Sequence, residues 1–148
     1  MENKAFEHDV FIAYSSADGL IAQDLARRLT SDGLKVWIDS KMLLSGMPIA
    51  MQVDRGLENS RALVLCMSKS AFGKEWRRLE AETFRFRDPL NKGRRFVPLR
   101  LDDADIPNPL DQVSYVDWRK KGELSNYSQL LDACTPPKGP NVLNSTDL

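Results

Sequence analysis

The chain has 148 residues, enough for one domain with a hydrophobic core but too few for two comfortable ones. Hydrophobic residues make up 42% of it and charged residues 28%, as in ordinary soluble globular proteins. The 21 lysines and arginines balance the 21 acidic residues, so no overall positive charge exists to attract nucleic acid or acidic lipid. This composition disfavours a nucleic-acid-binding protein.

Targeting and membrane signals are missing from the sequence. The first ten residues, MENKAFEHDV, lack the apolar core of a signal peptide, and no window approaches the length of a membrane span. Cys66 lies within the apolar run ALVLCM and is expected to be buried, whereas Cys134 begins the C-terminal tail; neither belongs to a CxxC pair. We therefore expect a cytoplasmic protein with reduced cysteines that binds neither membranes nor nucleic acid.

The first half of the chain contains two strand-turn-helix units. The run DVFIAY at 9–14 predicts a buried strand, and the polar residues after it predict a turn and a helix start. Gly33 is a natural stop for this helix. A second strand at 34–39, with Trp37 in the core, leads through the loop 40–47 to a helix opened by Pro48. The inner face of the first helix is expected to contain Leu20, Ile21, Leu25 and Leu29.

The second half continues the alternation. After Arg61, the run 61–67 is apolar without alternation, which predicts a central strand covered on both faces, and a helix over 71–86 follows it. A strand at 94–101 contains Pro98, which cannot donate to a β-ladder and favours an edge or terminal position. A weaker strand at 113–118 precedes a last helix at 123–133. The inner face of that helix is expected to consist of Leu124, Tyr127, Leu130 and Leu131.

Five strands alternating with about five helices predict an α/β fold with a parallel sheet covered on both faces. Right-handed crossovers place the strand-to-helix loops along one edge of such a sheet. The loops after Tyr14, Asp39 and Met67 are therefore expected to share a cleft.

The helix over 71–86 contains the strongest candidate for chemistry. Its apolar residues recur at helical spacing, and Glu80 lies about 40° round from Trp76, at the margin of that stripe. Glu75 and Glu82 fall near the opposite margin, so helical geometry alone does not decide which acid matters. Glu75, in the first turn, is explained by the positive end of the helix dipole.

Common catalytic motifs are absent from the sequence. It has no GxGxxG after the first strand, no GxxxxGK[ST] and no GxSxG. The single histidine, His8, lies before the first strand, where an exposed terminal side chain is expected, and no cysteine or second histidine accompanies it to bind zinc. No metal site is therefore expected. What remains is carboxylate chemistry, or no chemistry.

Several ordered blocks together resemble the Toll/interleukin-1 receptor (TIR) domain family, and look more like its bacterial or plant-type members. These blocks are DVFIAYSSAD, GLKVWID, a loop with Gly46, and LENSRALVLCMSKSAFGKEW with Glu80 four residues past Trp76. The resemblance covers 7–133 as a TIR domain and leaves 134–148 as a linker or disordered tail. It implies a flavodoxin-like five-stranded parallel sheet with helices on both faces.

The resemblance implies an activity as well as a fold. Many bacterial, plant and axonal TIR domains cleave nicotinamide from NAD with a glutamate in the third helix, and the matching residue here is Glu80. NAD would be the substrate, so no cofactor is expected. A single carboxylate is enough because nicotinamide leaves NAD as a neutral molecule and needs no general acid. Other members act by self-association alone, so the fold leaves the function open.

The same resemblance assigns further site residues. In the first loop, Ser15, Ser16 and Asp18 match positions that contact the nucleotide; helix capping is the structural alternative, since Ser15-x-x-Asp18 fits a capping pattern. Lys41 would be available to a phosphate, although a surface lysine seldom has so specific a role. Trp76 would face the cleft, with burial in the core as its alternative.

The loop 40–47 matches the family segment that moves on assembly or ligand entry. Its apolar residues stand where polar turn residues are usual, which suits a partner or a second copy of the domain. The self-association residues expected there are Met42, Leu43, Leu44 and Gly46. Two departures, Ala13 where many members carry serine and Glu75 before Trp76, remove no proposed catalytic group. Because TIR domains usually work attached to other modules, a longer parent protein is expected.

Two functional hypotheses follow. The first is an NAD+ nucleosidase that releases nicotinamide and ADP-ribose, or a cyclic ADP-ribose isomer, in cell-death, immune or defence signalling, and is activated by TIR self-association. The second is a non-catalytic TIR interaction module that acts as a homotypic signalling scaffold. A phosphoacceptor or flavin-binding domain is disfavoured, because the acidic cluster expected after the first strand and a phosphate-cradling loop are both missing.

Overall fold

Five parallel strands form one sheet in the computed structural model, which describes residues 7–38, 53, 56, 60–72, 95–107, 113–119 and 124–136. The order across the sheet is β2-β1-β3-β4-β5, the order of flavodoxin-like folds. The predicted α/β fold with a parallel sheet is therefore confirmed. The strands are β1 (His8–Ala13), β2 (Val36–Trp37), β3 (Ser60–Met67), β4 (Arg95–Arg100) and β5 (Val116–Asp117).

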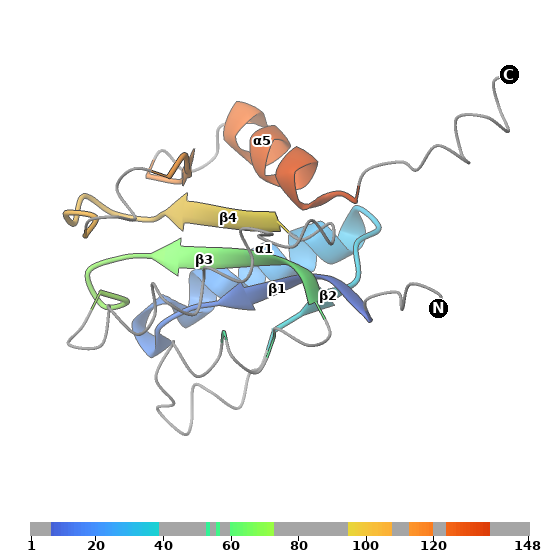
Figure 1. Cartoon of the computed structure of the whole chain (residues 1–148), viewed down its shortest axis with the longest axis horizontal. Coiled ribbons are helices and arrows are strands. Elements are labelled where there is room, and N and C mark those ends of the chain that lie inside the picture. Colours follow the sequence, from blue (N-terminus) through green and yellow to red (C-terminus); the bar gives the residue numbers. More distant parts are fainter. Residues whose placement is uncertain are drawn as a thin grey trace, which may run out of the picture.

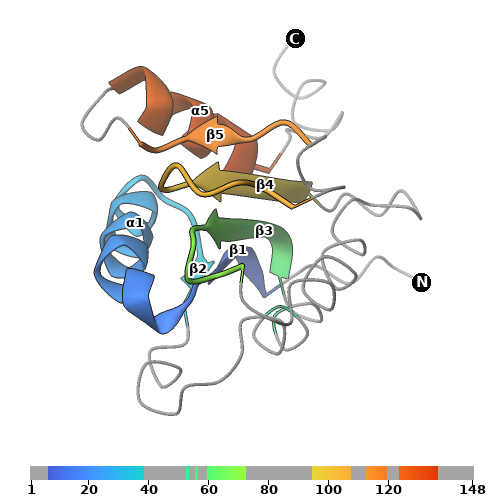
Figure 2. The same cartoon turned by 90° about the vertical axis from the view of Figure 1, so that its left-hand side faces the viewer.

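Two α-helices lie on the same face of the sheet, α1 (Gly19–Ser31) and α5 (Leu124–Cys134), as Figures 1 and 2 show. Under them Val10 and Ile12 of β1 pack with Leu25 and Leu29 of α1. On the opposite face Phe11 packs with a second set of buried residues, Ala13, Val53, Leu63, Leu65 and Met67. Alternate residues of β1 thus enter two cores, and the expected coverage of both faces is confirmed.

Strand β4 lies between β3 and β5, and Pro98 is an interior residue of β4, so the expectation that Pro98 marks an edge or terminal position is wrong. The reason lies in the alternation of backbone groups along β4. The Leu101 N–H donates to Met67 on the β3 side, and the Arg100 carbonyl accepts from Trp118 on the β5 side. By alternation, the missing N–H of Pro98 falls on the β5 side. There β5 pairs only from Leu99 onward, so no ladder bond is lost.

Three residues differ from their expected surroundings. Leu20 does not join the inner face of α1 but is 85% exposed, because it lies about 140° around the helix from Leu25. His8 was expected to be an exposed side chain before the first strand. It is instead half-buried within β1 and stacks on Trp37, with ring centroids 5.9 Å apart. Cys134, expected to begin the tail, is the buried last residue of α5.

Helix α1 ends at the glycine that the sequence predicts. Gly33 has a φ of 98°, in the left-handed region, and its N–H donates to the Thr30 carbonyl at 3.0 Å. The Leu34 N–H donates to the Leu29 carbonyl at 3.2 Å, which completes a Schellman motif. This turn directs the chain into β2.

Gly56 lies close against the ring of Phe11, between β2 and β3 in sequence. An added Cβ would stand 2.4 Å from Phe11 Cδ2, and the ring has little room to move because it is fully buried and packs on Trp37 at 4.8 Å. We expect Gly56→Ala to lower the free energy of unfolding by about 1–3 kcal/mol through overpacking. Urea denaturation of both proteins measures this.

Gly33→Ala is the control for that substitution. At Gly33 an added Cβ meets nothing within 4 Å, so only the positive φ opposes alanine, at a cost of about 1 kcal/mol. Gly56→Ala that is as stable as wild type would contradict the close contact, since helix propensity alone favours alanine over glycine.

Tyr127 of α5 ties that helix to the end of α1. Its hydroxyl donates to Asp32 Oδ2 at 2.5 Å, and the Arg28 guanidinium lies 4.2 Å from its ring centroid. Burial, and then the hydrogen bond to Asp32, raise the pKa of Tyr127 from 10.0 to about 12.

This shift predicts a pH dependence of stability. Because the folded state holds the Tyr127 proton more tightly than the unfolded state, the stabilisation is complete below pH 10 and is lost as the pH rises towards 12. Because solvent screens this partly exposed position, the stabilisation amounts to about 1 kcal/mol. Urea midpoints between pH 9.5 and 11.5 should fall more steeply for wild type than for Tyr127→Phe. Parallel curves would refute the link.

Candidate functional site

The loops after β1 and β3 meet at the carboxyl end of the sheet, towards which the arrowheads of β3 and β4 point in Figure 1. The Ser68 hydroxyl, just after β3, donates to Asp18 Oδ2 at 2.5 Å. The Ser15 hydroxyl, just after β1, donates to the same oxygen at 3.1 Å. The expected convergence is therefore confirmed for these two loops.

Ser15 and Asp18 occupy helix-capping positions, but their side chains do not form the hydrogen bonds of a helix cap. Ser15 is the N-cap of the short 3-10 helix η1 (Ser16–Asp18), and Asp18 is the N-cap of α1, yet neither side chain bonds a backbone N–H of its helix. The backbone closes the turn instead, since the Asp18 N–H donates to the Ser15 carbonyl at 2.8 Å. The hydroxyl of Ser15 and the carboxylate of Asp18 face each other.

Asp18 is a half-buried carboxylate whose Oδ2 accepts two hydroxyl groups. Within the part of the chain that the structure describes, no bond to its Oδ1 is seen. The neighbouring Ser16 is exposed. An acceptor oxygen and an exposed hydroxyl at the carboxyl end of a parallel sheet suit a polar ligand such as a sugar.

Ser68 is a partner of Asp18 that the sequence did not reveal. It is only 2% exposed, and its hydroxyl also accepts the Ala71 N–H at 3.3 Å. Its carbonyl accepts the N–H groups of Ala71 and Phe72 at 3.0 and 3.1 Å. These bonds form a turn, so the predicted helix over 71–86 does not begin at Ala71. A serine directly after a buried strand was the available signal.

A second carboxylate, Asp102, ties the loop after β3 to the loop after β4. Its Oδ2 accepts the Lys69 N–H and its Oδ1 accepts the Ala104 N–H, each at 3.0 Å. Arg100 also bonds this loop: it donates to the Asp102 carbonyl at 3.1 Å and to the Tyr115 hydroxyl at 2.8 Å. Side chains therefore link the ends of β1, β3 and β4.

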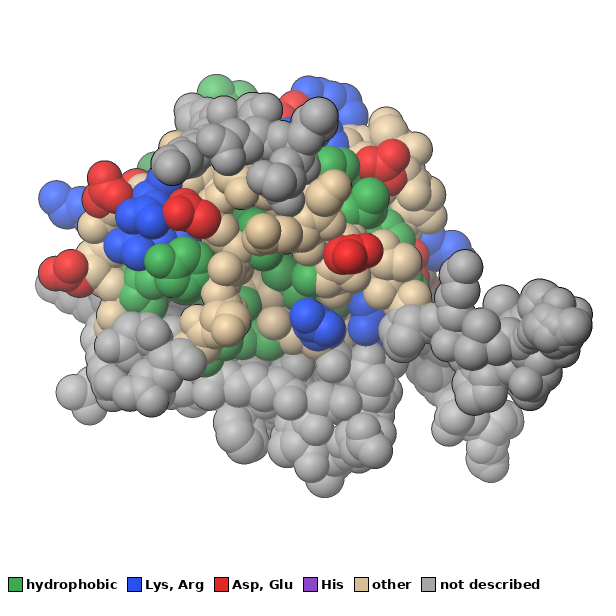
Figure 3. Space-filling model, turned by 90° about the horizontal axis from the view of Figure 1, so that it is seen from above, with side chains coloured by type: hydrophobic (Ala, Val, Ile, Leu, Met, Phe, Trp, Pro, Cys, Tyr) green, Lys and Arg blue, Asp and Glu red, His purple; other side chains and the backbone are tan. Residues whose placement is uncertain are grey.

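Charges near the end of β5 are paired with one another. Arg119 contacts Asp103 at 2.9 Å and Asp117 at 2.7 Å. The hydrogen bonds from Arg119 hold the pKa of Asp117 well below its ordinary value. Figure 3 shows acidic and basic side chains interspersed on the face that it displays, without a large patch of one sign.

The cysteine beside the site is not a nucleophile. Cys66 is fully buried, and burial, followed by the nearby charge of Asp18, raises the pKa of its thiol far above the ordinary value, which keeps it protonated. Among the described residues no group of potential metal ligands occurs, and no helix there is long and apolar enough to cross a membrane.

The structure places some of the predicted site residues and not others. Ser15, Ser16 and Asp18 are described, and Ser15 and Asp18 form a hydrogen-bonded cluster with Ser68. The following predicted residues lie outside the described ranges: Lys41, Met42, Leu43, Leu44, Gly46, Trp76 and Glu80. Their roles remain predictions.

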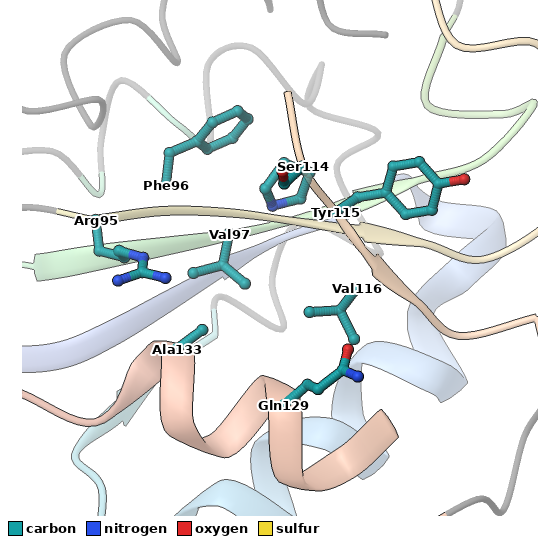
Figure 4. Close-up of a pocket in the computed structure, with 9 residues that line it drawn as sticks. Arg95, Phe96, Val97, Ser114, Tyr115, Val116, Gln129 and Ala133 are labelled. Atoms are coloured by element: carbon teal, nitrogen blue, oxygen red, sulfur yellow. The ribbon is translucent and has the colours of Figure 1, made fainter. Parts of the chain in front are cut away.

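A separate cavity of about 170 Å³ lies between β4, residues 114–116 and α5. Figure 4 shows Val97, Ala133 and Gln129 directed into the space between β4 and α5. The cavity lies beside the part of β4 that does not pair with β5. Its volume is below the usual range for small-molecule sites, and none of the predicted site residues lines it. The hydrogen-bonded cluster is therefore the better candidate site.

Two curated relatives carry names that state an activity. "NAD(+) hydrolase TcpA" from Theionarchaea archaeon (strain DG-70-1) is 37% identical over 79 residues, covering 53% of this chain and 24% of that protein. "2' cyclic ADP-D-ribose synthase AbTIR" from Acinetobacter baumannii (strain 1295743) is 28% identical over 115 residues, covering 73% of this chain and 42% of that protein. This chain thus spans less than half the length of either relative.

Fold and family comparisons agree with the observed topology. The solved structure of a metazoan TIR-STING receptor from C. gigas with 2',3'-cGAMP has a TM-score of 0.68 and 19% identity, covering 93% of this chain and 42% of that one. A family model described as "TIR domain" matches residues 10–131, which include β2 to β5 and all but the first two residues of β1. Because this match takes in most of the chain, the protein belongs to the TIR domain family.

Proposed function

We propose that this chain is an NAD+ nucleosidase, which releases nicotinamide and leaves ADP-ribose or a cyclic ADP-ribose isomer. The observation that carries the proposal is the Asp18 carboxylate, held by hydroxyls from two loops at the carboxyl end of the sheet. This is the edge where open α/β sheets bind their ligands. The names of the two curated relatives support the same reaction.

Glu80 is the proposed catalytic residue. When the bond between nicotinamide and the ribose C1′ breaks, nicotinamide leaves with the electron pair and positive charge develops on the ribose. A carboxylate beside the ribose stabilises that charge and holds the sugar hydroxyls. In hydrolysis, a water molecule attacks C1′ and loses a proton. In cyclisation, a nucleophilic atom of the ADP-ribose itself attacks C1′ instead. Glu80 is assigned these roles from the sequence resemblance alone, because it lies outside the described residues.

The cluster supplies the proposed substrate contacts. Because Ser15 and Ser68 occupy Oδ2 of Asp18, its Oδ1 is the oxygen proposed to accept a hydroxyl of the nucleotide. Ser16 is exposed next to it and can donate. Lys41 is proposed to contact a phosphate, and Trp76 to lie beside the cleft. Helix capping no longer accounts for the Ser15 hydroxyl, since no capping bond forms.

We further propose that self-association through Met42, Leu43, Leu44 and Gly46 activates the domain, in cell-death, immune or defence signalling within the cytoplasm. The apolar character of these residues in a predicted loop supports a contact with another copy. Since the chain spans 24% and 42% of the two relatives described, we propose that further domains of a longer parent protein control the assembly.

Incubation of the concentrated domain with NAD tests the proposal. Nicotinamide release is followed by chromatography for wild type and for Glu80→Gln at equal concentrations. Release by wild type and not by the variant supports the enzyme. Absence of turnover in wild type, even under crowding or enforced oligomerisation, would favour the non-catalytic interaction module instead.

A further inference from the structure

The Ser68 hydroxyl connects two loops that the proposed reaction uses. It donates to Asp18 Oδ2 at 2.5 Å and accepts the Ala71 N–H at 3.3 Å. Because Ser68 is only 2% exposed, water has little access to compete for these bonds. One hydroxyl thus joins the end of η1 to the turn at 68–72 after β3.

We propose that Ser68 is a positioning residue for NAD cleavage, which fixes the Asp18 carboxylate against the turn at 68–72. This inference rests on the proposed function. Ser68 is too buried to touch the substrate and acts through Asp18 and the turn at 68–72. Correct placement of a group that holds the reacting substrate contributes much of the rate in such reactions.

The bonding pattern separates this role from a purely structural one. Without the hydroxyl, the Ala71 N–H still bonds the Ser68 carbonyl at 3.0 Å, and the Lys69 N–H still bonds Asp102 at 3.0 Å. The turn therefore keeps its backbone bonds in Ser68→Ala. Asp18 Oδ2, however, loses its shorter bond and retains only Ser15 at 3.1 Å. The carboxylate becomes free to rotate while the fold persists.

Steady-state kinetics with NAD test this role. Ser68→Ala should lower kcat by about 10- to 100-fold, as expected for misplaced groups, while KM changes by less than about threefold. Ser68→Thr, which keeps the hydroxyl, should restore most of kcat. Ser70→Ala is the matched control, because Ser70 is exposed in the same turn, and it should behave as wild type.

Two further variants keep the test decisive if Ser68→Ala folds poorly. Ser68→Cys keeps the size of the side chain but supplies only a weak donor, so it should fold and still be slow. A kcat within about twofold of wild type in Ser68→Ala or Ser68→Cys would overturn the positioning role. So would a Ser68→Thr variant that folds but is as slow as Ser68→Ala.

A double-mutant cycle of folding stability distinguishes failure of this inference from failure of the proposed function. Urea midpoints are measured for wild type, Asp18→Asn, Ser68→Ala and the double variant, none of which needs activity. Contact between the two side chains predicts non-additive midpoint shifts. Additive shifts overturn the link between Ser68 and Asp18. A wild type that releases no nicotinamide overturns the proposed function, and the cycle then still decides the link.

Discussion

Replacing Glu80 by glutamine should reduce the rate of nicotinamide release by at least about 100-fold. Glutamine keeps the size of the side chain and can still bond a sugar hydroxyl, but it carries no charge to stabilise the developing positive charge on the ribose. Losing one such electrostatic contact costs about 100- to 1,000-fold in kcat. The measurement is steady-state nicotinamide release, with kcat and KM determined separately.

Two neighbouring acids provide matched controls for this prediction. Glu75→Gln and Glu82→Gln remove the same charge from the same predicted helix, where helical spacing places both residues near its opposite margin. Both variants should retain activity within a few-fold of wild type. If Glu75→Gln or Glu82→Gln abolishes release while Glu80→Gln does not, the assignment by resemblance is wrong and the other acid is catalytic.

The central strands could be predicted from the sequence because their signals are local. The run from Ala62 to Met67 is apolar at every position, which is typical of a strand buried on both faces, and β3 is buried in this way. Gly33 was equally predictable, since a helix that must turn sharply needs a residue tolerant of positive φ.

The errors arose where tertiary arrangement decides between local alternatives. Leu20 and Ile21 are adjacent and lie about 100° apart around the helix; Ile21 packs against the core and Leu20 does not. Pro98 is tolerated inside the sheet because β5 is too short to reach it. Neither the register of β5 nor the direction of α1 can be obtained from hydrophobic periodicity.

The candidate site likewise combines residues that the sequence could indicate with a contact that only the fold creates. Ser15 and Asp18 could be selected because the family resemblance matches them to positions that contact the nucleotide, but the partner of Asp18 could not be identified. Ser68 lies fifty positions along the chain, and only the parallel pairing of β1 with β3 brings their carboxyl ends together. A contact of this kind depends on topology, which periodicity does not contain.

Specific activity should rise with protein concentration, by up to about 100-fold if the competent arrangement has a population of about 1% in the monomer. Association through Met42, Leu43 and Leu44 would increase that population without adding a catalytic group. The measurement is nicotinamide release per molecule over a wide concentration range, alongside light scattering to follow the oligomeric state.

Polar substitution in the loop tests whether that association uses these residues. Leu43→Ser with Leu44→Ser should flatten the rise in specific activity while leaving the urea midpoint close to that of wild type. Leu20→Ser is the matched control, because Leu20 is an 85% exposed leucine outside the loop, at the start of α1. If Leu20→Ser flattens the rise and the loop variant does not, the copies associate through α1 instead. Specific activity that stays constant with concentration in all three proteins would show that self-association does not activate this domain.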